Sequence, residues 1–157
     1  MSKFTHYKPA LKTAFYSHVS ALKQKIGLKR KPTGRVMHKG MDHALERYAR
    51  ICHTLLAHIP EPSSLSSAVA SEIGCGDCFA AADMMLGLGA KHVHLVEFLP
   101  FELTDDNREA LKALAAQENL PNKGTVFDSS GSPQLDKDKA TYHQGLLENI
   151  QLPEKVD

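Results

Sequence analysis

Apolar residues recur at helical spacing along one stretch in the first half of the chain. They are Met41, Ala44, Leu45, Tyr48, Cys52, Leu55, Leu56 and Ile59, and Pro60 follows them directly. This spacing places the apolar side chains on one side of a helix, and a proline cannot continue the hydrogen-bond ladder of a helix. The pattern therefore predicts an amphipathic helix over residues 41–59.

A different pattern occupies residues 68–97. A short apolar, β-prone run that ends at Ile73 leads into Gly74 and Gly76, and an Ala- and Met-rich stretch then runs to Gly87 and Gly89. A second apolar run, Val93 to Val96, ends on Glu97. Strand, glycine turn, helix and strand within thirty residues is typical of one βαβ unit of a parallel sheet. The fold class predicted is α/β.

The rest of the chain gives shorter signals. Thr104 and Asp105 are good helix caps, and they precede an apolar stripe, Ala110, Leu111, Leu114 and Ala115, that ends before Pro121. Residues 104–128 are thus expected to hold a helix and then a third strand, Thr125 to Phe127, which Asp128 ends. Residues 140–150 are interpreted as a weaker helix that contains Gly145.

The candidate chemistry lies at the carboxyl ends of the first two predicted strands. Gly74 and Gly76 allow a sharp turn and a close approach of a ligand to the main chain. Glu72 lies two residues before Gly74, and Glu97 follows the second strand. An acid in the place of Glu97 typically binds the two hydroxyl groups of a ribose. Phe79 stands where a dinucleotide fingerprint needs Gly or Ala, so the pattern favours a nucleoside ligand over NAD or FAD.

The order acid-x-Gly-x-Gly, here Glu72, Gly74 and Gly76, resembles the first motif of the class I S-adenosylmethionine-dependent methyltransferases, and the resemblance covers residues 66–128. It implies a Rossmann-like three-layer sheet and S-adenosylmethionine as cofactor. It also implies that Glu72 and the turn, Cys75 included, hold the methionine part, that Glu97 beside Phe98 holds the ribose, and that Asp128 or Ser129 contacts the adenine edge. Cys78 replaces a third glycine that many members have.

The activity that follows from the resemblance is methyl transfer to a small-molecule or glycan acceptor. No catalytic residue is predicted, because Tyr142 and His143 are candidate bases by residue type only. The run Lys155-Val156-Asp157 resembles the lead into a fourth strand of the family. The chain therefore resembles the amino-terminal part of the domain, truncated after the third strand, either as a fragment that could be inactive alone or as a reduced protein.

Two alternatives come from other features. Cys75 and Cys78 form a C-x-x-C at a helix start, which is typical of a thiol-disulfide oxidoreductase, although the nearby Glu72 would oppose thiolate formation. His92 and His94 could share a strand face, but they lie at its amino end, opposite the edge where ligands bind, so no metal site is predicted.

The second alternative is a binding module with a basic arm. Ten of the nineteen Lys and Arg residues lie within residues 1–39, where no Asp or Glu occurs, and one amphipathic helix is expected from about Pro9 to Ile26. Such an arm can bind an anionic membrane surface or nucleic acid, or simply pack on residues 40–157, the partial methyltransferase domain. With three cysteines and no signal-peptide core, the expected location is the cytoplasm, peripheral to a membrane if the arm binds one.

Overall fold

A computed structural model describes most of the second half of the molecule and part of the first. The described residues are 39–59, 61, 65–76, 79–97, 103–117, 119–123, 125–130, 134–145 and 149–152. The chain forms two compact units, Met1–Pro32 and Thr33–Asp157, and every described residue belongs to the second. The helix predicted within the basic arm lies outside the described residues.

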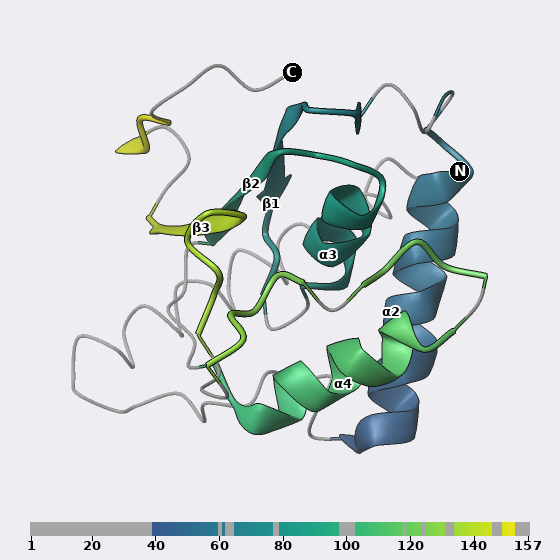
Figure 1. Ribbon diagram of the computed structural model, residues 1–157. Helices are drawn as coiled ribbons and strands as arrows, with labels where there is room; N and C mark the ends of the chain where they lie inside the picture. Colours follow the sequence, from purple (N-terminus) through teal and green to yellow (C-terminus); the bar gives the residue numbers. More distant parts are fainter. Residues whose placement is uncertain are drawn as a thin grey trace, which may run out of the picture. The chain divides into compact units, whose positions relative to one another are not determined.

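Three parallel strands form the sheet of this unit (Figure 1). They are β1, Val69–Ile73, β2, His92–Glu97, and β3, Ala140–Gln144, and β2 lies between the other two. β1 pairs with β2 in a register that places Ile73 opposite Val96, and β2 pairs with β3 so that Glu97 is opposite Gln144. The carboxyl ends of all three strands therefore lie along one edge of the sheet.

Within the described residues, three helices accompany the sheet: α2, Met41–Leu56, α3, Ala80–Gly87, and α4, Asp105–Ala115. α3 joins β1 to β2 and packs against both strands, and α2 packs against α3 and α4 (Figure 1). The predicted βαβ unit and the predicted mixed α/β class are confirmed. α2 ends at Leu56, before the expected Ile59, since Ala57 caps the helix through backbone bonds to His53 and Leu55.

The core lies between α3 and the face of the sheet that carries Val93 and Leu95, both of which are completely buried. Alternate residues of a strand point to opposite faces, so Ala70 and Ala140 join this face from the neighbouring strands. Tyr48 of α2 is also buried here. It belongs to the core, as its place on the apolar side of the predicted helix indicates.

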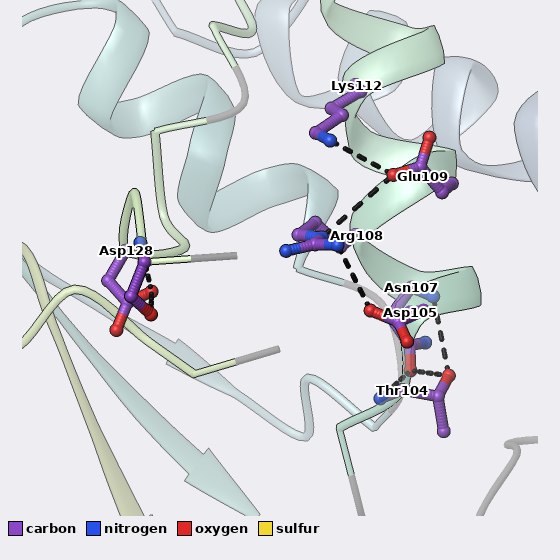
Figure 2. Close-up of polar contacts among 8 residues, drawn as sticks. Thr104, Asp105, Asn107, Arg108, Glu109, Lys112 and Asp128 are labelled. Carbon is purple, nitrogen blue, oxygen red and sulfur yellow. Dashed lines mark hydrogen bonds and ion pairs between the residues drawn. The ribbon is translucent and has the colours of Figure 1, made fainter. Parts of the chain in front are cut away.

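α4 begins as the sequence predicts. The hydroxyl of Thr104 accepts a hydrogen bond from the backbone N–H of Asn107, and the side chain of Asn107 accepts one from the backbone N–H of Thr104 (Figure 2). This reciprocal capping box satisfies two amide groups that a helix start otherwise leaves without partners.

The strand predicted at Thr125 to Phe127 is wrong. Phe127 forms only an isolated antiparallel bridge with Leu135, and the segment does not join the sheet. The physical reason lies in Asp83 of α3, a completely buried residue whose carboxylate accepts hydrogen bonds from the backbone N–H groups of Lys123, Thr125 and Val126. Two of these donors belong to the predicted strand itself, so they are unavailable for a strand ladder.

The helix predicted over residues 140–150 is also wrong at its start, because the third strand of the sheet is Ala140–Gln144. Thr141 and Tyr142 are residue types that favour strands. The strand ends where Gly145 takes a φ of 150° and donates a hydrogen bond to the carbonyl of Glu97. Backbone hydrogen bonds to the edge of β2, together with the conformation of Gly145, favour a strand here over the helix that the weak pattern predicts.

Candidate functional site

The glycine turn after β1 is the centre of the candidate site. Gly74 and Gly76 have φ angles of 77° and 60°, in the left-handed region that strains residues with a Cβ atom. A Cβ atom built on either glycine would meet nothing within 4 Å, so open space lies above the turn. The turn therefore has room beside both glycines, and its role in ligand binding stays a prediction.

Glu97 at the end of β2 reaches across to this turn. Its Oε2 atom accepts a hydrogen bond from the backbone N–H of Gly76, at a donor–acceptor distance of 2.8 Å. The backbone continues the sheet on both sides of this residue, because Gly74 donates to the carbonyl of Val96 and Gly145 to that of Glu97. The sheet thereby fixes the position of the Glu97 carboxylate relative to the turn.

Glu72 lies on the opposite side of the turn, under the start of α3. Its Oε2 atom accepts a hydrogen bond from the backbone N–H of Ala82 at 3.1 Å, so it binds one of the amide groups that open the helix. Burial raises the pKa of Glu72 to about 8, although the hydrogen bond from Ala82 acts in the opposite direction. A carboxyl group of this kind gains from a cation nearby, because a positive charge favours its ionised form.

Cys75 lies between these two acids and is buried in the core. Burial raises the pKa of its thiol, and the negative charges of Glu72 and Glu97 raise it further. A redox cysteine needs the opposite shift, since the thiolate is the reactive form. Cys78, the other member of the predicted pair, lies outside the described residues, and the surroundings of Cys75 oppose the oxidoreductase alternative.

Tyr142 of β3 was considered only as a base by residue type, and its neighbourhood was missed. Tyr142 lies opposite Leu95, on the sheet face that also carries Glu97, and packs against the core cluster that contains Cys75. Burial raises the pKa of its phenol, and the charges of Cys75 and Glu97 raise it further. The same side chain lines an open cavity of about 440 Å³ together with Leu103, Leu135 and Ala140. The β-prone run Thr141-Tyr142 was the sequence signal that could have found this residue.

Asp128 and Ser129 are not brought to the turn by any strand of the sheet. The carboxylate of Asp128 accepts hydrogen bonds from the N–H and the hydroxyl of Ser130, at 3.0 and 2.6 Å, and Ser129 is exposed. Figure 2 shows Asp128 in its own turn, away from the polar contacts of α4. The reason for placing the adenine edge at these residues was the predicted strand, which does not form. Phe98 lies outside the described residues.

The residue that does end the third strand is Gln144, which is exposed and lies opposite Glu97. The candidate site as the structure arranges it therefore combines two acids, the glycine turn and the end of β3. Among the described residues, no group of three or more His, Cys, Asp or Glu side chains could hold a metal ion.

No protein-family model matches this chain, and no curated protein matches its sequence. Within the described part of the chain, no helix is long and apolar enough to cross a membrane.

Proposed function

We propose that this chain binds S-adenosylmethionine at the glycine turn and belongs to the class I methyltransferases, with a Rossmann-like sheet. The observation that carries the proposal is the hydrogen bond of 2.8 Å between the N–H of Gly76 and the carboxylate of Glu97. It joins an open glycine turn to an acid at the end of the next strand, which is the arrangement that recognises a ribose. In this proposal the carboxylate of Glu97 also accepts a hydrogen bond from a ribose hydroxyl.

The charges of the site suit the remainder of this cofactor. S-adenosylmethionine carries an ammonium group and a sulfonium group, and it supplies the electrophilic methyl group when bound. Glu72, with its pKa raised to about 8 by burial, is a carboxyl group that a nearby cation would stabilise in its ionised form. In this proposal Glu72 has two roles, because it also holds the N–H of Ala82 at the start of α3.

The adenine edge is assigned to the end of β3. Gln144 ends the strand opposite Glu97 and is exposed. A carboxamide offers both a donor and an acceptor, which match the edge of an adenine base. Gln144 thus replaces Asp128 in the proposed site.

Methyl transfer from a sulfonium is an in-line displacement, so the protein contributes mainly by holding donor and acceptor in reactive geometry. The proposed activity is methyl transfer to a small molecule or a glycan.

The test is a calorimetric titration of the 157-residue chain with S-adenosylmethionine and with S-adenosylhomocysteine. We expect Glu97→Ala to weaken both affinities by roughly 10- to 100-fold, since hydrogen bonds to a charged group are worth about 1.5–3 kcal/mol each. Glu109→Ala is the matched control, because Glu109 lies on the exposed side of α4 and pairs with Lys112. Equal affinities of the wild type and Glu97→Ala would overturn the proposal.

A further inference from the structure

Three histidines form a cluster on the face of the sheet opposite Val93 and Leu95. His92 and His94 come from β2, and His143 comes from β3. The ring centroids of His92 and His94 are 4.9 Å apart, and those of His94 and His143 are 5.0 Å apart. His94, in the middle, is only 1% exposed. The cluster therefore joins two neighbouring strands through imidazole side chains.

The contact between the strands is a hydrogen bond of 2.9 Å from one imidazole to another, Nδ1 of His94 to Nε2 of His143. One of these two nitrogens must carry the proton and the other must accept it. When both rings are protonated, both facing nitrogens carry a proton, so the bond is lost and two cations lie within van der Waals reach of each other. The bond can exist only while the pair holds at most one positive charge.

His92 is held differently. Its Nδ1 atom lies 3.1 Å from the carbonyl oxygen of Asp138, so Nδ1 carries a proton, and its Nε2 atom lies 3.0 Å from the hydroxyl of Thr141. Both contacts survive protonation, because a hydroxyl can accept as well as donate. Protonated His92 would add a positive charge next to His94.

Among the described residues, the charged side chains next to the three histidines in the chain include lysines and aspartates. Lys91 precedes β2, and Asp138 and Lys139 precede β3. Lys139 pairs with Asp136, and no carboxylate of the described residues forms an ion pair with His92 or His143. From β1, Ser71 contributes only a hydroxyl, which donates to the carbonyl of His94. Burial, and after it the charge of His92, lowers the pKa of His143.

We propose that the three histidines form a proton-sensitive latch, which holds β3 to β2 at neutral pH and releases β3 in mildly acidic solution. β3 carries Tyr142, near Cys75 and Glu97, so its release opens the carboxyl edge of the sheet. The latch is independent of the proposed cofactor, and it can be tested without any ligand.

The first experiment measures the unfolding equilibrium of the full chain in urea at pH 7.5 and at pH 5.5. A histidine whose pKa is lowered on folding raises the unfolding constant between pH 7.5 and pH 5.5, by at most about tenfold when its unfolded pKa is near 6.5. Glu72 acts in the opposite direction over this interval, equally in the wild type and in a histidine variant. His143→Gln removes one titrating group and keeps a hydrogen-bonding side chain. We expect the ratio of the unfolding constant at pH 5.5 to that at pH 7.5 to be up to about tenfold smaller in this variant than in the wild type.

The matched control is His53→Gln, because His53 is exposed on α2 and far from the sheet in sequence and contacts. It should keep the pH dependence of the wild type. If the ratio of the unfolding constants at pH 5.5 and pH 7.5 is the same in His143→Gln as in the wild type, the proposed latch is wrong.

A second experiment needs only the wild type, and it decides the question even if His143→Gln does not fold. Amide hydrogen exchange, corrected for the intrinsic rate, is compared at the two pH values. We expect the amides of Thr141 and His143 to lose protection at pH 5.5 by at least tenfold more than the amide of Ala70 in β1. Equal losses in β1 and β3 would mean that the strand is not released, and would refute the proposal.

Discussion

The two crossover connections of the sheet are built by different means. The first, from β1 through α3 to β2, follows a tight turn whose glycines have positive φ angles, and its helix is buried directly on the sheet. The second, from β2 through α4 to β3, adds a long excursion over residues 116–139. Backbone N–H groups of that segment donate hydrogen bonds to the carboxylate of Asp83, which belongs to the first connection. The local chain shapes the first crossover, whereas the second depends on a contact with the first.

The substitution Asp83→Ala tests the dependence of the second connection on the first, and it should have the largest effect. The substitution leaves the amide groups of Lys123, Thr125 and Val126 without their acceptor in a buried site. We expect the free energy of unfolding to fall by roughly 3–5 kcal/mol, measured in urea. Asp106→Ala, at an exposed position of α4, should cost less than about 1 kcal/mol. Similar losses in the two variants would contradict the role of Asp83.

A second contact between the crossovers is tested by Gly87→Ala. A Cβ atom on Gly87, at the end of α3, would lie 1.8 Å from the carbonyl oxygen of Pro121 in the second connection. Because this neighbour is backbone, the two segments must move apart, and we expect a loss of roughly 1–3 kcal/mol in the free energy of unfolding. A melting temperature equal to that of the wild type would show that the two segments do not pack so closely.

The first crossover also carries a titrating group, Glu72. Its pKa rises from 4.5 to about 8 on folding, so the folded state binds a proton more tightly than the unfolded state does. This contribution is complete below pH 4.5 and is lost as the pH rises to 8. We expect Glu72→Gln, which cannot ionise, to gain on the order of 3–4 kcal/mol relative to the wild type between pH 5 and 8.5, since one pKa unit corresponds to about 1.4 kcal/mol. A constant difference in stability across this range would contradict the shift.

The smallest expected effect concerns the adenine contact, which could lie at Gln144 or at Asp128. If the end of β3 is the adenine contact, Gln144→Ala should weaken the binding of S-adenosylhomocysteine by about fivefold, the worth of one hydrogen bond. Asp128→Ala, in the turn before β3, should leave the affinity unchanged. The reverse result would return the adenine contact to Asp128.

The sequence predicted the first crossover closely because its signals are local. Positive φ at Gly74 and Gly76 and the apolar run of β2 depend on residues near each other in the chain. Glu97 lies at the carboxyl end of β2, as predicted, and this position brings its carboxylate to the glycine turn.

The third strand could not be predicted in the same way. Both Thr125 to Phe127 and Ala140 to Gln144 have residues suited to strands, and what separates them is the Asp83 carboxylate, which is more than forty residues away from Thr125. The histidine cluster and the approach of Tyr142 to Glu97 depend on the register of β3, so they could not be found before that strand was placed.

The central claim is that the N–H of Gly76 and the carboxylate of Glu97 together form a nucleoside site. The most direct measurement follows the backbone amide resonance of Gly76 in the nitrogen-15-labelled chain during titration with S-adenosylhomocysteine. We predict a saturable shift of this resonance in the wild type and a much weaker response in Glu97→Ala. A folded wild-type chain whose Gly76 resonance does not move at millimolar ligand would contradict the account.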